Sequence, residues 1–472
     1  MSTSRSPRRG RIRRILLGIL LFVLFVSAVR FCGWRGSDLR AWPEPAAGEA
    51  PAAVPPAETN ALATPADCRA LLAVLPPADA APAAALERFA REGATALSDA
   101  ERAALRARAG TSNEVLRAYV GFLESHPGFV PAAGADVADY AMLLARSGEL
   151  DVLFALAAAS GEDGLCAADL GRQAGRVARA FGRGCGITGR FAALQGNVSF
   201  LSRECILLSL EAPGAFSGAP ETIGAFRAAE DAFAPLPDAI REDWAAYRVA
   251  VADVYDQVEG RAPRDGSASV PGQARVSGTM AFLIRNLGGG REATLAHLDA
   301  LFSRLAANAA SPYSPEGMAQ GLPEWCRDPD AHTPWTRDPV GAVLGSSYVR
   351  QALAAGAFEP SARLELRAAR LAVALRTWRD AHGEYPATLD ELLGGVDAPL
   401  REEDVADPFS PAGERLRYAR DGAGWRFHSV GLDQRDDGGA SGAADPRASG
   451  TDFLFTSRER EFRKASSHGK KP

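Results

Sequence analysis

The sequence predicts a mainly α protein, with a membrane-anchored helical body followed by a small α+β C-terminal domain. Three observations indicate this fold class. An uncharged apolar segment follows a cluster of arginines near the N-terminus. Apolar residues then recur at spacings of three and four through most of the chain, as they do on the buried face of an α-helix. Near the C-terminus, short segments separated by a glycine-rich turn are typical of antiparallel strands.

Composition is that of a globular protein with an acidic body. The chain has 472 residues, of which 47% are hydrophobic and 24% are charged, and this length leaves room for two or three domains. Nearly all basic residues are arginine, and alanine is abundant, which indicates the coding bias of a GC-rich genome. Beyond the six arginines between Arg5 and Arg14, 47 basic residues face 58 acidic ones. An acidic body does not favour binding to phosphates, so we expect no nucleic-acid partner.

The N-terminus predicts a membrane anchor. Residues 1–14 form a basic segment, and Ile15–Val29 carries no charge. As a helix, the segment 15–34 would be about 30 Å long, which matches the hydrocarbon core of a bilayer. Because the arginines precede it, the positive-inside rule predicts a single-pass anchor with a cytoplasmic N-terminus and an extracytoplasmic body. The alternative is a cleaved signal peptide, since small residues stand at 26–28. Residues 35–66, rich in Pro and Ala, predict an extended linker.

We predict a helical domain over residues 67–339. Capping boxes at Ser98–Glu101 and Thr111–Glu114 mark two helix starts. Two apolar stripes at helical spacing predict buried faces; they are Val115, Leu116, Tyr119, Val120, Phe122 and Leu123 in the first, and Leu295, Leu298, Phe302 and Leu305 in the second.

Five cysteines follow the anchor, at positions 68, 166, 185, 205 and 326. The absence of a CxxC pair argues against a thiol-redox motif or a zinc ribbon. In an exported protein we expect one or two disulfides, whose pairing the spacing does not decide, with at least one thiol left over.

One apparent nucleotide-binding motif is not convincing. Residues 184–189, "GCGITG", match the GxGxxG fingerprint of dinucleotide-binding folds. That motif requires a preceding strand, whereas the residues before it, "GRVARAF", have a helical pattern. We therefore do not predict a dinucleotide site.

The segment 312–339 offers the one candidate for enzymatic chemistry. It is long and gathers tryptophans, acids and a histidine. Long loops of this composition can form sugar or peptide sites, and Glu324, Asp328 and His332 would then be the acid–base residues of an envelope hydrolase. Equally, such a loop can lie flat over a helical core, held there by its tryptophans.

Residues 340–456 predict the small α+β domain. Leu364, Ala368, Leu371, Leu375 and Trp378 stand three or four residues apart and predict one long amphipathic helix that ends near Gly383. Two short strands follow, "RLRYAR" and "WRFHSVG", separated by the turn signal "DGAG". The segment "TDFLFT" supplies a third strand, and the basic residues 457–472 predict a disordered tail.

These segments occur in a familiar order. The long helix, "HGEYPATLDELL", "DPF", "LRYAR", "FHSVGLDQRDDGG" and "DFLF" together resemble the globular part of the major pseudopilin of bacterial type II secretion, over residues 360–456. The resemblance implies a calcium-binding loop before the final strand. Carried over by position, its ligands would be Asp433, Asp436, Asp437 and Asp452, and Asp445 is a weaker candidate. Pseudopilins begin with a processed leader and a membrane helix that continues directly into this domain, whereas here most of the chain separates the two.

The residues themselves are compatible with such a loop. Calcium prefers six to eight oxygen ligands from carboxylates and carbonyls in a flexible segment. Asp433, Asp436 and Asp437, followed by Gly438 and Gly439, could wrap around an ion in that way. The alternative is a solvated Asp/Gly turn that binds no metal.

The sequence therefore predicts a bacterial inner-membrane protein with an extracytoplasmic body and no enzymatic activity. We expect it to bind or scaffold proteins at the cell envelope, with a link to a type II secretion-like system. The hydrolase with a site in 312–339 is the alternative.

Overall fold

The computed structural model describes residues 62–75, 98–104 except 99 and 102, 113–130, 137–160, 165–211, 218–259, 290–327, 338–395, 399–439 and 452–457. The predicted basic segment, anchor, most of the linker and nearly all of the tail lie outside these residues. No helix in the described part of the chain is long and apolar enough to cross a bilayer.

The described chain is mainly helical and ends in a small sheet, as the sequence predicts. The first group of helices is α2 (Pro65–Val74), α5 (Asn113–Ser125), α6 (Val137–Ser160), α7 (Ala167–Phe181), α8 (Gly186–Phe191), the π-helix η4 (Ala192–Val198), α9 (Ser199–Glu211) and α10 (Ala219–Asp231). A second group follows, namely α11 (Leu236–Val258), α13 (Arg291–Ala309), α14 (Pro315–Ala319), α15 (Glu324–Arg327) and α16 (Pro339–Gly356). The chain continues with α17 (Phe358–His382), α18 (Leu389–Leu393), α19 (Glu402–Val405), β1 (Arg417–Asp421), β2 (Gly424–Ser429) and β3 (Phe453–Thr456).

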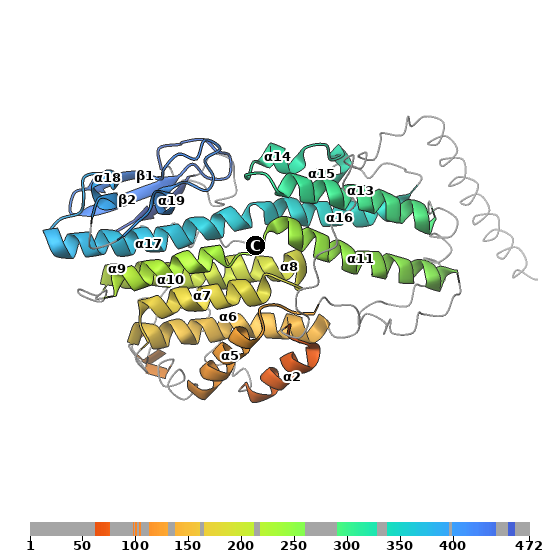
Figure 1. Cartoon of the computed structure of the whole chain (residues 1–472), viewed down its shortest axis with the longest axis horizontal. Helices are drawn as coiled ribbons and strands as arrows, with labels where there is room; N and C mark the ends of the chain where they lie inside the picture. Colours follow the sequence, from red (N-terminus) through yellow and green to blue (C-terminus); the bar gives the residue numbers. More distant parts are fainter. Residues whose placement is uncertain are drawn as a thin grey trace, which may run out of the picture.

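Two buried cores organise these elements. The larger core joins the first group of helices to α17 and the sheet, and the smaller core belongs to the second group, α11–α16. In Figure 1 the long helix α17 lies between the sheet on one side and α9 and α10 on the other. The helical body and the C-terminal segment therefore share a core. The predicted domain boundary at residue 339 stays a prediction. The two buried cores change over at other places in the chain, near residues 235 and 358.

Helix α17 corrects one expectation. It ends at Gly383, as predicted, with that residue in the left-handed conformation that favours glycine (φ 83°). Up to Trp378 it has no exposed residue, however, and even Glu365, Arg370 and Arg376 are buried. The polar face is buried because it meets partners of opposite charge from the helical body, such as Glu230 on α10.

The sheet has the expected antiparallel order β1-β2-β3. The "DGAG" turn pairs Asp421 with Gly424, and its Gly422 has the positive φ that a tight hairpin requires. Strand β3 returns along β2 with Phe455 opposite Phe427. On the face of the sheet that carries Phe427 and Phe455, stacked aromatic rings pack against the rest of the larger core. The stacked pairs are Trp425–Phe427, Phe427–Phe455 and Phe409–Phe453.

Other expectations have mixed outcomes. The capping box at Ser98 is present, because its amide and hydroxyl both donate to Glu101 and its hydroxyl accepts from the Glu101 amide. The start of the box at Thr111 lies outside the described residues. Both apolar stripes are buried at their centres, for example at Tyr119 and Phe302. The expected disulfides are absent from the described part of the chain, since its five cysteines are all free thiols.

Candidate metal centre

The acidic loop begins where strand β2 ends, and a buried aspartate fixes that point. Asp407 accepts a hydrogen bond from the Ser429 hydroxyl (2.7 Å) and another from the Val430 amide (2.8 Å). Asp407 stands in the short "DPF" segment, and its carboxylate also accepts from the amide of Phe409. Because these bonds are buried, the first residues of the loop have a fixed direction as they leave the sheet.

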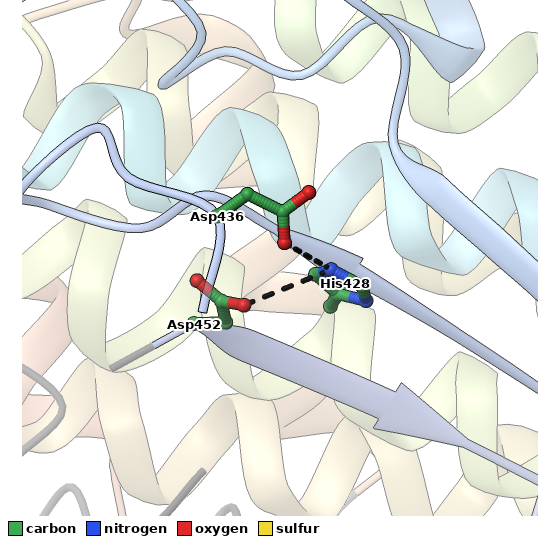
Figure 2. A group of neighbouring side chains, drawn as sticks. All are labelled: His428, Asp436 and Asp452. Carbon is green, nitrogen blue, oxygen red and sulfur yellow. Dashed lines mark hydrogen bonds and ion pairs between the residues drawn. The ribbon is translucent and has the colours of Figure 1, made fainter. Parts of the chain in front are cut away.

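Three side chains converge beyond that point (Figure 2). Nε2 of His428, on β2, lies 3.1 Å from Oδ1 of Asp436 in the loop and 3.7 Å from Oδ2 of Asp452 at the start of β3. One ligand atom from each residue lies within 4.8 Å of the others. Asp452 is almost fully buried, whereas Asp436 is exposed.

Hydrogen bonds hold both carboxylates in place. Asp452 accepts from the amides of Asp437 (3.1 Å) and Gly439 (2.7 Å), so the loop folds back over the start of β3. Asp436 accepts from the Gly438 amide at 2.9 Å and pairs with Arg417 of β1. The positive φ of Gly438 and Gly439 makes this close wrapping possible.

The two carboxyl groups have opposite electrostatic environments. The Gly438 amide, followed by His428, holds the pKa of Asp436 below its ordinary value. Burial raises the pKa of Asp452 above its ordinary value, although the amides of Gly439 and Asp437 partly oppose that shift. A divalent cation between them would favour the charged form of both groups.

The structure brings together two of the predicted ligands. Asp436 and Asp452 lie in the cluster. Asp437 reaches it through its backbone amide, and Asp433 instead accepts from the amide of Arg435 at 3.1 Å. The weaker candidate Asp445 lies outside the described residues. The four predicted aspartates therefore do not all converge in the described loop. Metal binding by the loop stays a prediction.

His428 was not among the predicted ligands, because the acidic loop alone does not indicate it. In an antiparallel pair, directly opposed residues share a face, and residues two apart on one strand share it too. His428 is opposite Leu454, so Asp452 lies on the face of His428. The hairpin pattern and this register rule could have placed the histidine beside the acid.

This donor set restricts the chemistry of the site. Calcium prefers oxygen, so it would use the carboxylates of Asp436 and Asp452 with carbonyl oxygens of the loop. A nitrogen donor such as His428 suits zinc and similar transition metals. Arg417 already offsets part of the negative charge, and both Arg417 and His428 contact the carboxylate of Asp436, so an ion would have to compete with both.

The hydrolase alternative gains no support from the described residues. Glu324 is exposed at the first position of α15, and Asp328 and His332 lie outside the described part of the chain. The last acid of the segment, Asp338, is buried and caps α16 by accepting from the amide of Gly341. Its other oxygen lies 3.1 Å from Nδ1 of His297, which fits a structural role.

The glycine-rich segment 184–189 also has a structural role. It follows helix α7 rather than the strand that a dinucleotide-binding motif requires. Its amides are already bonded to carboxylates of α11, since Gly184 donates to Glu242 and Ile187 donates to Asp243. The chain's own acids thus occupy the donors that a phosphate would need.

Comparison with protein-family models, curated proteins and solved structures gives no significant match for this chain.

Proposed function

We propose that this protein is a non-enzymatic scaffold of the bacterial cell envelope, with residues 15–34 anchoring it in the inner membrane and its body outside the cytoplasm. On this proposal it binds envelope proteins, including components of a type II secretion-like system, through its C-terminal segment. The supporting observation is the way in which the pseudopilin-like elements are attached. Helix α17 is buried between the sheet and helices α9 and α10.

That attachment favours a scaffold over a filament subunit. In a pseudopilin, a membrane helix continues into the globular domain. Here α17 follows α16, and its surface is already in contact with the body of the same chain. The sheet and its loop would therefore be presented on a helical support, at the distance from the bilayer that the linker 35–66 allows.

The membrane topology can be tested on the intact protein through Cys166, which is exposed, whereas Cys205 and Cys326 are buried. After mild reduction, a membrane-impermeant maleimide added to intact spheroplasts should label Cys166. The comparison is made in a Cys185→Ser background, because Cys185 is half-buried. There Cys166→Ser should remove the labelling, and the buried thiols should react only after denaturation. Labelling that requires lysis of the spheroplasts would contradict an extracytoplasmic body.

The scaffold can be tested by photo-cross-linking in living cells. A photoreactive amino acid at Ala423, exposed on the β1–β2 turn, reports on the C-terminal segment. One at Val249, which is exposed on α11, is the matched control on the second group of helices. We expect a defined envelope protein to be captured from Ala423 and not from Val249. If neither position captures a partner and a hydrolytic activity disappears in Glu324→Gln, the hydrolase is the better explanation.

We further propose that the loop at His428 binds calcium through Asp436 and Asp452, with Asp433 and Asp437 completing the site by moving inward. Calcium at a hundredfold excess over its dissociation constant should stabilise the full chain by about 2.7 kcal/mol. Thermal melting in calcium, zinc and chelator measures this. Asp436→Asn should abolish the effect, while Asp390→Asn, an exposed acid of α18, should keep it. Stabilisation by zinc alone would contradict the choice of calcium, and three equal melting curves would exclude a metal.

A further inference from the structure

Four helices of the body meet around a group of polar side chains in the interior of the larger core. Helix α5 contributes Tyr119, α6 contributes Ser147 and Asp151, α7 contributes Gln173, and the π-helix η4 contributes Asn197. The first four have no exposed surface, and Asn197 is 6% exposed. Helices α5, α6 and α7 are the stacked layers below α9 and α10 in Figure 1. Buried polar groups are costly unless they are hydrogen-bonded, so this group requires an explanation.

Part of the group forms a directed chain of hydrogen bonds. The amide of Gln173 donates to Oδ1 of Asp151 at 2.8 Å. The amide of Asn197 donates to the hydroxyl of Ser147 at 2.9 Å, and that hydroxyl donates to the carbonyl of Leu144 at 2.7 Å. Ser147 can still accept one more hydrogen bond, because its oxygen has two lone pairs.

Three buried atoms in the group have no hydrogen-bond partner: Oδ2 of Asp151, the hydroxyl of Tyr119 and Oε1 of Gln173. Tyr119 is nevertheless close enough to Asp151 and Ser147 for each to act on its pKa. An ionised carboxylate at this position would be buried among neutral groups, which is expensive in free energy.

No cation offsets that charge among the groups known to act on Asp151, which are Gln173, Asn197 and Tyr119. Four arginines on helices packed against α6 have carboxylate partners elsewhere, and neither Arg117 of α5 nor Arg179 of α7 is among the groups that act on Asp151. The pairs are Arg69–Asp139, Arg172–Asp169, Arg172–Glu221, Arg176–Glu124 and Arg203–Glu365. The remaining titratable groups on those helices include the thiols of Cys68 and Cys205, and burial raises the pKa of both. They stay neutral and supply no positive charge.

We propose that this cluster is a buried proton-binding site, at which Asp151 binds one proton on Oδ2 and, through that proton, donates a hydrogen bond to the hydroxyl oxygen of Tyr119. Tyr119 then donates to Ser147, and the chain continues through Ser147 to the carbonyl of Leu144. Loss of the proton reverses the first bond, because Tyr119 must then donate to the carboxylate and Ser147 loses its second donor. One proton thus determines whether helices α5 and α6 share a complete hydrogen-bond chain.

The electrostatic environment supports this assignment. Burial raises the pKa of Asp151 to about 7, against smaller opposing contributions from Gln173, Asn197 and Tyr119. Because the folded pKa lies above that of the unfolded chain, the folded state binds the proton more tightly. The resulting stability is present at low pH and is lost as the pH rises through about 7. The pH range of this site therefore lies above the range in which ordinary carboxylates titrate.

The test compares the melting temperature of the full chain with that of Asp151→Asn from about pH 5 to about pH 8.5. The melting temperature of the natural chain should fall over this range, relative to the variant, and level off above the midpoint. Glu242 and Asp243 also have raised pKa values because of burial, but both remain in the variant, so the difference isolates Asp151. Parallel profiles for the two proteins would overturn the proposal.

Two further measurements guard against a variant that fails to fold. Infrared difference spectra of the natural chain across the same pH range should show the carbonyl stretch of a buried, protonated carboxylic acid. Tyr119→Phe removes a donor to the carboxylate, so the midpoint should move to higher pH. An unchanged midpoint in Tyr119→Phe, or no protonated carboxyl signal in the natural chain, would contradict the site.

Discussion

Glu230 on α10 is the carboxylate on which three arginines of α17 converge. Arg370 and Arg367 bond to it directly, and Arg363 lies 3.3 Å away. Burial by itself would raise the pKa of Glu230, but the charges of Arg370 and Arg367 outweigh it and lower that pKa to about 2. Arg370 is itself 1% exposed and also pairs with the buried Asp404 of α19. This network connects the body to the C-terminal segment through buried charges.

We predict that Glu230→Gln destabilises the protein by about 3–5 kcal/mol, because it leaves buried arginine charge without its partner. The control is Glu221→Gln on the same helix, where the ion pair with Arg172 is exposed and should be worth less than about 1 kcal/mol. Denaturant unfolding of both variants measures the difference. Equal, small losses would show that the Glu230 network contributes little.

Glu230 should also make the protein less stable in acid. The folded pKa of Glu230 lies below the ordinary value, so its contribution is present at neutral pH and disappears as the pH falls towards about 2. The direction is opposite to that at Asp151, where stability falls as the pH rises. The two groups therefore act in separate pH ranges, and Glu230→Gln should remove only the acid limb of the stability profile.

At the scale of elements, the C-terminal end of α17 depends on one backbone conformation. Gly383 has φ 83°, and its amide donates to the carbonyl of Arg379 to close the last turn. A Cβ at this position would meet no atom within 4 Å, so backbone conformation alone sets the cost of a side chain. The sequence after it, Tyr385-Pro386, turns the chain back towards the sheet, where the carbonyl of Pro386 accepts from the hydroxyl of Tyr418.

We predict that Gly383→Ala destabilises the protein by about 1–2 kcal/mol, the cost of a left-handed conformation for a residue with a Cβ. Gly224 within α10 is the matched control, since a Cβ there also meets nothing within 4 Å. Its replacement by alanine should instead stabilise the helix by roughly 0.5–1 kcal/mol. Thermal unfolding of both variants decides the point, and a loss of similar size at both positions would show that conformation is not the cause.

At the scale of the whole molecule, the larger core draws on segments from both ends of the described chain. Residues as far apart as Ala63 and Phe455 belong to it, while the helices α11–α16 between them form the smaller core. Gln434 in the acidic loop bonds to the carbonyl of Tyr313 at 2.8 Å, which also ties the loop to the segment before α14. The sheet is thus part of the fold of the body.

We predict that a chain truncated after residue 339 does not fold cooperatively. The truncation removes α17 and so exposes the apolar faces of α9 and α10, which that helix covers. Circular dichroism during heating should show a broad transition, and the fragment should bind hydrophobic dyes. A sharp transition close to that of the intact protein would show that residues 340–472 form a separable domain.

The sequence by itself determined the elements whose signals are local. The stripe containing Tyr119 predicted α5, the glycine at 383 predicted the end of α17, and "DGAG" predicted the hairpin, because propensity, capping and turn chemistry act over a few residues. The sequence also indicated the acidic loop and two of the side chains that meet there, Asp436 and Asp452.

Only the tertiary structure decided which polar residues are buried and what they meet. The spacing on α17 marks its apolar residues, but Arg370 becomes a core residue because Glu230 arrives from another helix. His428 joins the candidate metal centre through strand pairing, and Asp151 loses solvent through the packing of four helices. The physical reason is common to all three. The energy of a charge depends on its solvent exposure and on partners distant in sequence, and local sequence patterns specify neither.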